Sequence, residues 1–287
     1  MDISIQKSKL LNHQNIQITG SKSESNRLLL LQALYPEISI DNLSNSDDSV
    51  LMQKALSSND EVVDIHHAGT AMRFLTAYFS IQEGRETLLT GSSRMKERPI
   101  KILVDALRQL GSDIQYLEND GFPPIKIKGK KLTKNKVSLN ANVSSQYISA
   151  LLLIASRLEN GLELNLEGKI TSVPYIKMTL SLLNEVGIET SFVENTIVVK
   201  PNTSNLKSKV LTVESDWSSA SYFYSIVALS PIGTEIELSS YREESLQGDS
   251  VLADIYKSFG VVTEYRKDSI LLKKIGNPQS ESVEFQL

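Results

Sequence analysis

The chain has 287 residues, of which 40% are hydrophobic and 22% are charged, and this composition is that of a globular protein and not of a disordered or collagen-like one. A chain of this length predicts about two domains. The formal net charge of −4 argues against a broad nucleic-acid-binding surface, so any anion must be bound locally.

Cysteine and histidine usage excludes further classes of site. The chain has no cysteine, which rules out disulfides, thiolate metal sites and a cysteine nucleophile. Its histidines, His13, His66 and His67, do not have the spacing of a metal centre. The N-terminal residues lack the apolar run of a secretory signal, and the longest apolar runs, 28–31 and 148–155, are too short to cross a bilayer. We therefore expect a soluble cytoplasmic protein.

The first predicted helix begins directly after Gly20 with Ser-Lys-Ser-Glu-Ser-Asn-Arg, residues 21–27, and continues through four leucines. A helix start offers free backbone N–H groups and the positive end of the helix dipole. Serine hydroxyls can donate to phosphate oxygens, and Lys22 and Arg27 add full charges. The segment is typical of a phosphate site, although a serine N-cap with solvated basic neighbours would have the same sequence.

Two further segments place glycine, hydroxyls or cations at the start of a helix. Residues 68–73, Ala-Gly-Thr-Ala-Met-Arg, repeat the combination of glycine, hydroxyl and arginine. Residues 93–99, Ser-Arg-Met-Lys-Glu-Arg-Pro, bring three cations together just before a helix whose start is marked by proline. An isolated run of surface cations is usually only solvated. In a net-negative protein, however, cations concentrated beside helix starts indicate a pocket for a small, multiply anionic ligand.

A unit of amphipathic helix, glycine, strand, polar turn and strand recurs along the chain. The copies cover residues 98–128, 174–200 and 250–273, and their glycines are Gly111, Gly187 and Gly260. Each glycine follows the last apolar helix position, where a left-handed residue turns the chain into the strand. The glycines are 76 and 73 residues apart, which predicts an internal repeat of a large α/β unit.

Other helices open with hydroxyl residues and are apolar on most faces. They include residues 143–155, which begin with Ser144, Ser145 and Gln146, the helix that starts between Ser172 and Tyr175, and residues 215–223. Capping or packing explains each pattern alone, but their recurrence at element junctions favours a shared polar site. Helices with leucine on most faces must be surrounded by protein, so we expect buried central helices wrapped by sheets.

The last five residues, 283–287, alternate like a strand, and no turn or partner strand follows them. This pattern predicts a repeat protein that is cut within a strand.

The order of these motifs resembles the family of 5-enolpyruvylshikimate-3-phosphate synthase, also called 3-phosphoshikimate 1-carboxyvinyltransferase. The motifs are Lys-Ser-x-Ser-Asn-Arg at 22–27, Ala-Gly-Thr-Ala-Met-Arg at 68–73, Arg-Met-Lys-Glu-Arg-Pro at 94–99, Ser-Ser-Gln at 144–146, Ser-x-Pro-Tyr at 172–175, Ser-Ser-Ala-Ser-Tyr-Phe at 218–223 and Gln-Gly-Asp at 247–249. The match covers the chain from Gly20 to Gly260, and seven motifs in the family's order make it very specific.

The resemblance implies a two-lobed inside-out α/β barrel, in which each lobe is assembled from three copies of one repeat and the site lies between the lobes. Residues 21–214 would form the complete first lobe, and residues 1–20 with 215–287 would form an incomplete second lobe. The implied reaction transfers the carboxyvinyl group of phosphoenolpyruvate to the 5-hydroxyl of shikimate 3-phosphate and releases phosphate, in chorismate and aromatic amino acid biosynthesis. It uses no metal or organic cofactor, and we expect a monomer that binds neither nucleic acid nor membrane.

The resemblance also implies roles for individual residues. Lys22 would contact both substrates and is a candidate for proton transfer at the enolpyruvyl carbon. The residues implied to hold shikimate 3-phosphate are Lys22, Ser23, Arg27, Ser144, Ser145, Ser172 and Tyr175. Those implied to hold phosphoenolpyruvate are Lys22, Gly69, Arg94 and Gln146.

This sequence departs from the family pattern at His67, Phe74 and residues 92–93, which would alter the pocket wall and with it inhibitor response and substrate affinity. It also departs in length, because family members continue with a general-base aspartate, a glutamate implicated in proton transfer and further cations that grip phosphoenolpyruvate. The resemblance therefore predicts a C-terminally truncated chain with little or no activity.

Two other interpretations remain open. The related enolpyruvyl transferase that acts on a UDP-amino sugar shares the fold but typically uses a cysteine, and it lacks the Lys-Ser-x-Ser-Asn-Arg pattern present here at residues 22–27. A non-enzymatic interpretation is an inactive fragment that folds its first lobe and only binds shikimate 3-phosphate.

Overall fold

The computed structural model describes residues 4, 11–142, 144–202 and 206–278. The chain divides into two compact units: unit 2 comprises residues 21–213, and unit 1 comprises residues 1–20 and 214–287. Glu214, which the sequence interpretation places in the first lobe, belongs to unit 1, where its carboxylate accepts hydrogen bonds from Trp217 and Ser245. The strand expected at residues 283–287 lies outside the described residues.

Unit 2 combines helices with several small sheets. Its helices are α1 (Lys22–Leu34), α2 (Asp47–Ser57), α3 (Gly69–Ser80), α4 (Ser93–Lys96), α5 (Lys101–Leu110), α6 (Ser145–Ala155) and α7 (Val173–Glu185). Its strands are β2 (Ile38–Asp41), β3 (Val62–Asp64), β4 (Glu86–Thr90), β5 (Asp113–Tyr116), β6 (Ile125–Lys128), β7 (Lys136–Asn140), β8 (Leu162–Glu167), β9 (Thr190–Val193), β10 (Thr196–Val199) and β11 (Lys209–Thr212). The strands pair in the orders β3-β4-β6-β5, β7-β8-β10-β9 and β11-β2.

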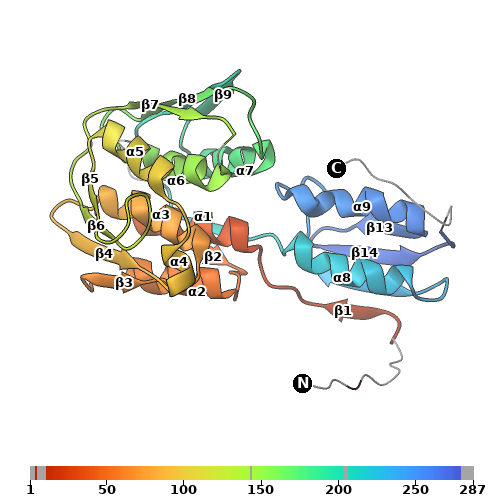
Figure 1. Cartoon of the computed structure of the whole chain (residues 1–287). Coiled ribbons are helices and arrows are strands. Elements are labelled where there is room, and N and C mark those ends of the chain that lie inside the picture. The colour runs from red at the N-terminus through yellow and green to blue at the C-terminus, as the bar shows by residue number, and fades with distance from the viewer. Residues whose placement is uncertain (1–3, 5–10, 143, 203–205, 279–287) are drawn as a thin grey trace. The chain divides into compact units, whose positions relative to one another are not determined.

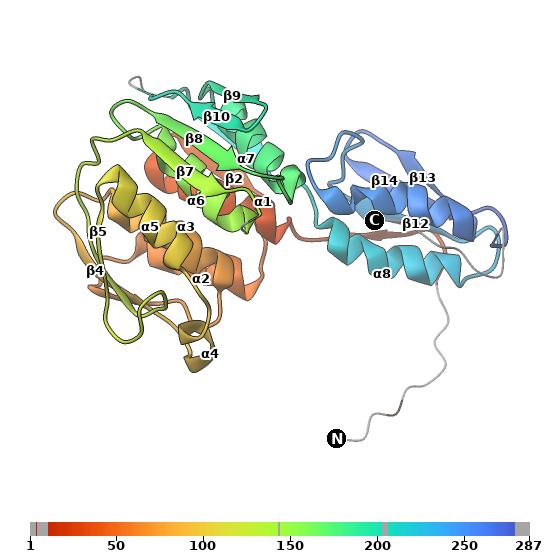
Figure 2. The same ribbon diagram turned by 45° about the horizontal axis from the view of Figure 1, so that its top comes forward.

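Helices α1, α3 and α6 form the interior of unit 2. All residues of α3 are buried, and in α6 only Gln146 is partly exposed. Helix α3 packs against both α1 and α6, and Figure 1 shows the three side by side. Figure 2 shows β4 and β5 on one side of these helices and β7 and β8 on another. The sequence-based prediction of central apolar helices wrapped by sheets is therefore confirmed for this unit.

Unit 1 is built around a single four-stranded sheet, against which helix α8 (Trp217–Ala228) packs. Its other elements are β1 (Gln14–Ile16), β12 (Glu235–Ser239), α9 (Leu252–Ile255), β13 (Val261–Tyr265) and β14 (Ser269–Lys274). Residues 250–259, predicted as one helix, instead form a 3₁₀ turn (Gly248–Val251), the short α9 and a second 3₁₀ turn (Tyr256–Phe259). The β-branched and aromatic residues of this segment have low helix propensity, which explains the difference.

The predicted repeat is confirmed by strand pairing and by the glycines. In the order β3-β4-β6-β5 the first pair is parallel and the next two are antiparallel. The same pattern holds for β7-β8-β10-β9 and for the unit 1 order β1-β12-β14-β13. Gly111, Gly187 and Gly260 have φ angles of 105°, 90° and 73°, the left-handed conformation that lets each helix turn into its hairpin.

Helix α8 packs on the unit 1 sheet with one face and exposes apolar side chains on the other. Trp217, Tyr224 and neighbouring residues join the buried core of the unit. Tyr222, Ile226 and Leu229 are 72%, 40% and 90% exposed, and their spacing aligns them along one side of the helix. Unit 1 therefore carries an exposed apolar strip, whereas α3 in unit 2 is buried on all sides. None of the described helices is both long and apolar enough to cross a lipid bilayer.

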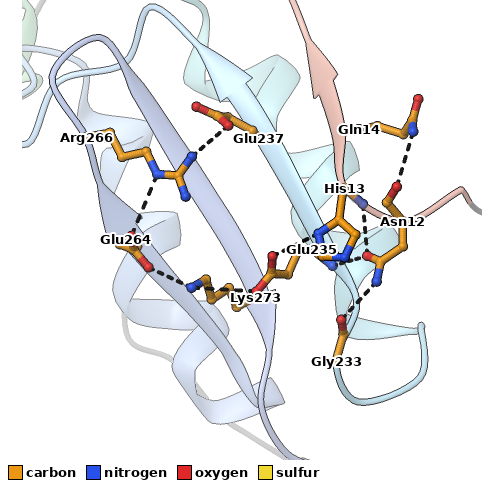
Figure 3. Close-up of polar contacts among 9 residues, drawn as sticks. All are labelled: Asn12, His13, Gln14, Gly233, Glu235, Glu237, Glu264, Arg266 and Lys273. Carbon is orange, nitrogen blue, oxygen red and sulfur yellow. Dashed lines mark hydrogen bonds and ion pairs between the residues drawn. The ribbon is translucent and has the colours of Figure 1, made fainter.

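The N-terminal strand β1 is fastened to β12 by polar contacts at its start (Figure 3). Asn12 accepts a hydrogen bond from the backbone N–H of Glu235 through Oδ1 (2.6 Å) and donates through Nδ2 to the carbonyl oxygen of Gly233 (3.1 Å). His13 Nδ1 lies 3.1 Å from the Glu235 carboxylate. These contacts join segments more than 220 residues apart, so they tie residues 12–16 into unit 1.

Cross-strand ion pairs continue from this point over the polar face of the same sheet (Figure 3). Lys273 Nζ lies 3.6 Å from the carboxylate of Glu235 and 2.8 Å from that of Glu264, and Arg266 pairs with Glu237 at 2.7 Å. Lys273 lowers the pKa of Glu264, as expected for a carboxylate beside a cation. Water screens exposed pairs of this kind, so the apolar core supplies most of the stability of the sheet.

Candidate anion-binding site

The contacts of the Arg27 side chain place the starts of four helices at the same end of unit 2. Arg27 is the sixth residue of α1, and its Nε donates to Thr179 Oγ1, in the second turn of α7, at 2.8 Å. Its Nη2 donates to Ser149 Oγ, the fifth residue of α6, at 2.9 Å. Its guanidinium lies 5.5 Å from the ring centroid of Phe74, the sixth residue of α3. Each contacting residue lies within the first two turns of its helix, so the starts of α1, α3, α6 and α7 lie close together.

Converging helix starts create an environment that favours an anion. Each start presents backbone N–H groups without intrahelical acceptors and the positive end of a helix dipole. Part of this capacity is used within the protein, because Asp48 Oδ1 accepts from the N–H of Thr70 (3.1 Å) and Ser144 Oγ accepts from that of Gln146 (3.3 Å). The predicted phosphate-binding segments therefore meet at one place although up to 150 residues separate them.

Arg27 lies inside this end of the unit and not on its surface. The residue is 2% exposed, and it also donates to the carbonyl oxygens of Ser23 (2.7 Å) and Tyr175 (3.5 Å). Burial lowers the pKa of Arg27 to about 10, since a desolvated guanidinium is less easily charged. These contacts hold the starts of α1 and α7 in place. A direct contact between Arg27 and shikimate 3-phosphate stays a prediction.

The other residues predicted to hold shikimate 3-phosphate lie at the same helix starts. Lys22 and Ser144 are exposed, and Ser145 is buried as the first residue of α6. Ser172 is the N-cap of α7 with a left-handed φ of 56°, and the side chain of Tyr175 is 42% exposed, with its ring centroid 5.9 Å from Arg27 Cζ. The structure thus places hydroxyls, a phenol and an ammonium group around one end of the helix bundle.

The residues predicted to hold phosphoenolpyruvate are only partly brought together. Gln146 Nε2 donates to Thr70 Oγ1 at 3.4 Å, which places the start of α6 beside Gly69, the first residue of α3. Arg94 lies on the short helix α4 and is exposed. Within the part of the chain that the structure describes, the side chain of Arg94 makes no hydrogen bond or ion pair with the other predicted residues.

The site contains two buried hydroxyls that lie outside the motifs, and an arginine, Arg73, that lies within a motif but was assigned no role. Ser149 and Thr179 are buried hydroxyls that bond to each other (2.9 Å) as well as to Arg27. A hydroxyl within an apolar helix needs a polar partner, so both positions carried a sequence signal. Arg73, which is 6% exposed, donates through Nη1 to the carbonyl oxygen of Gly69 (2.8 Å). Burial chiefly, and Arg98 to a smaller degree, lower the pKa of Arg73.

A hollow of about 410 Å³ lies at the opposite end of the same helices. Its lining includes the ends of α1, α3 and α6, with Lys130, Lys131 and Arg157 as cations and Glu83 and Glu159 as acids. Helix C-termini carry the negative ends of the dipoles and so oppose an anion there. The helix starts are therefore the better anion site.

Comparison with known proteins identifies a family. Residues 53–284 match the sequence profile described as EPSP synthase (3-phosphoshikimate 1-carboxyvinyltransferase). The chain is 50% identical over 263 residues to 3-phosphoshikimate 1-carboxyvinyltransferase of Bacteroides fragilis strain YCH46, covering 91% of this chain and 63% of the relative. It is 38% identical over 288 residues to the protein of the same name from Actinobacillus pleuropneumoniae serotype 5b, covering 89% and 65%.

The solved structures agree on the fold. The structure of EPSP synthase from Acinetobacter baumannii matches with a TM-score of 0.74 at 20% sequence identity, over 91% of this chain and 64% of that one. The identity is too low for this match to show more than a shared α/β architecture. In all three comparisons the chain spans 63–65% of the length of the protein that it matches.

Proposed function

This chain belongs to the EPSP synthase family, and on that premise we propose that unit 2 holds shikimate 3-phosphate at the converging starts of α1, α3, α6 and α7. The single observation that carries the proposal is the set of contacts made by Arg27. These contacts join the four helices within the first two turns of each. A phosphate and a carboxylate need fixed donors and cations, and this end of the unit supplies both.

The proposed reaction is the transfer of a carboxyvinyl group. The 5-hydroxyl would lose its proton as its oxygen bonds to C2 of phosphoenolpyruvate and a proton adds to C3. Loss of phosphate from C2 with loss of a proton from C3 would then restore the double bond. Lys22 is exposed at the start of α1 and is the proposed proton carrier at C3. The remaining residues would hold two anionic substrates side by side against their mutual repulsion. This positioning and charge neutralisation would supply most of the rate enhancement.

Substrate binding tests the proposal directly. We expect calorimetric titration of the 287-residue chain to show saturable binding of shikimate 3-phosphate. Lys22→Met should weaken this binding about tenfold or more, because one charge-assisted contact is worth about 1.4 kcal/mol or more. Lys22 is exposed, so its replacement should leave the fold intact. The matched control is Lys54→Met, which removes an exposed ammonium from α2. No binding at millimolar ligand, or an equal loss in the control, would refute the proposal.

We further propose that a preparation of these 287 residues alone catalyses the reaction poorly. None of the ten residues predicted to form the site is acidic, so that set offers no carboxylate to take the proton of the 5-hydroxyl. General base catalysis typically contributes a factor of about 10²–10⁴. We therefore expect phosphate release from the two substrates to be slower by at least that factor than with a full-length relative such as the Bacteroides fragilis protein. Turnover at an equal rate would contradict this expectation.

A further inference from the structure

The guanidinium of Arg98 lies directly against the backbone of Gly69 at the start of α3. A Cβ atom added to Gly69 would be 2.8 Å from Cζ and 2.9 Å from Nη2 of Arg98, which is closer than real Cβ contacts. Gly69 does not have a left-handed φ angle, so its own conformation does not demand glycine. A side chain at position 69 would therefore require the guanidinium, the flexible end of the arginine side chain, to move.

Two interior helices fix the segment that carries Arg98. The next residue, Pro99, has its carbonyl oxygen bonded to the phenol of Tyr147 on α6 (2.7 Å) and to Nη2 of Arg73 on α3 (3.5 Å). On either side, Met95 and Ile100 are 1% and 0% exposed. Arg98 is itself exposed, but its backbone is anchored by these buried neighbours. The packing of unit 2 therefore fixes the backbone that carries this side chain.

Two arginine side chains meet at the start of α3. Arg73 is 6% exposed, and its Nε atom has no acceptor among the described groups. Among the described residues, the guanidinium of Arg98 makes no hydrogen bond or ion pair. The acid beside them is Asp48, whose carboxylate accepts from the N–H of Thr70 at 3.1 Å. Two guanidinium groups thus lie at the start of a twelve-residue helix, whose positive dipole end adds to their charge.

We propose that Arg98 is a further anion-binding residue of the site, and that it binds the phosphate or carboxylate of phosphoenolpyruvate above Gly69. The inference rests on the proposed function and adds to it a residue that the motif comparison leaves without a role. Arg73 and Tyr147 act as positioning residues, because they hold the carbonyl of Pro99 and do not need to touch the ligand. A planar guanidinium that can donate twice suits either anionic group of this substrate.

The test is titration of phosphoenolpyruvate into the 287-residue chain saturated with shikimate 3-phosphate. We expect Arg98→Gln to weaken phosphoenolpyruvate binding about tenfold, which corresponds to about 1.4 kcal/mol, and to change shikimate 3-phosphate affinity less than twofold. The matched control is Lys96→Gln, which removes a cation from the same segment that is paired on the surface with Glu118 at 2.6 Å. Unchanged phosphoenolpyruvate affinity in Arg98→Gln, or an equal loss in Lys96→Gln, would overturn the inference.

A double-mutant cycle tests the contact between Arg98 and Gly69 itself. Gly69→Ala should displace the guanidinium and weaken phosphoenolpyruvate binding in the wild-type background, but add little in the Arg98→Gln background. Strictly additive losses would show that the contact does not contribute to binding.

Titration with inorganic phosphate, followed by ³¹P NMR, separates this inference from the proposed function. If shikimate 3-phosphate does not bind, the proposed function fails, and phosphate binding that depends on Arg98 would still support an anion site above Gly69. Phosphate binding that is equal in wild type and Arg98→Gln, or absent at millimolar phosphate, would overturn that site as well.

Discussion

Replacing Arg27 with alanine is expected to lower the free energy of unfolding of unit 2 by about 3 kcal/mol, because it removes a side chain packed against Phe74 and leaves a cavity between four helices. Replacing it with methionine should cost only about 1 kcal/mol, since methionine fills much of the space and removes a buried charge. Ser149 and Thr179 would still bond to each other, so their hydroxyls keep a partner.

The Arg27→Met variant therefore separates stability from binding. Both variants should bind shikimate 3-phosphate at least about tenfold more weakly, because the starts of α1 and α7 are no longer joined through Ser23 and Tyr175. The measurement is urea unfolding followed by circular dichroism, together with calorimetry of the ligand. Arg27→Met that binds the ligand with wild-type affinity would show that this arginine contributes to packing alone.

The position of the only tryptophan supplies an internal control for unit 2 variants. Trp217 lies in the core of unit 1, so its fluorescence follows the unfolding of that unit. Arg27→Ala should lower the midpoint seen by circular dichroism and leave the fluorescence midpoint unchanged. Equal shifts of both midpoints would mean that the two units unfold together, and the free energy would then belong to the whole chain.

Replacing Glu214 with alanine is expected to destabilise unit 1 by about 4 kcal/mol, because it removes the acceptor of several buried donors. Glu214 is 2% exposed. Its Oε1 accepts from the indole N–H of Trp217 (2.8 Å) and from the backbone N–H of Arg242 (3.0 Å). Its Oε2 accepts from the hydroxyl of Ser245 (2.6 Å) and from Nε2 of Gln247 (3.4 Å). This carboxylate thus joins the start of α8 to the segment after β12.

Glutamine at the same position should cost less, about 2 kcal/mol. Its amide can keep the acceptor toward Trp217 and Arg242, and the hydroxyl of Ser245 can rotate to accept from the new NH₂ group. Urea unfolding followed by Trp217 fluorescence measures both changes. Glu244→Gln is the control, because it alters an exposed glutamate in the same segment and should change stability by less than about 0.5 kcal/mol. Glu214→Ala with wild-type stability would show that water replaces the carboxylate.

Local sequence patterns determined much of the fold and the identity of the elements at the site. Gly111, Gly187 and Gly260 could be predicted as left-handed turns because only the chain next to each glycine decides that conformation. Hydroxyl and glycine residues before apolar runs marked the starts of α1, α3, α6 and α8 for the same reason. The prediction of one continuous helix at residues 250–259 was wrong, because this segment forms two 3₁₀ turns and a short α-helix. The residues there have weak helix propensity, so packing decides the backbone conformation.

Only the tertiary structure decided which of these helix starts meet and what each charged side chain does there. The local pattern showed both Arg27 and Arg98 as cations near helix starts, but Arg27 is buried among four helices and the guanidinium of Arg98 lies against the backbone of Gly69. The difference arises because burial and partner depend on side chains that are up to 152 residues away, such as Thr179. The spacing of apolar residues along the chain indicates which face of a helix is apolar, but it does not indicate which other helix packs against that face.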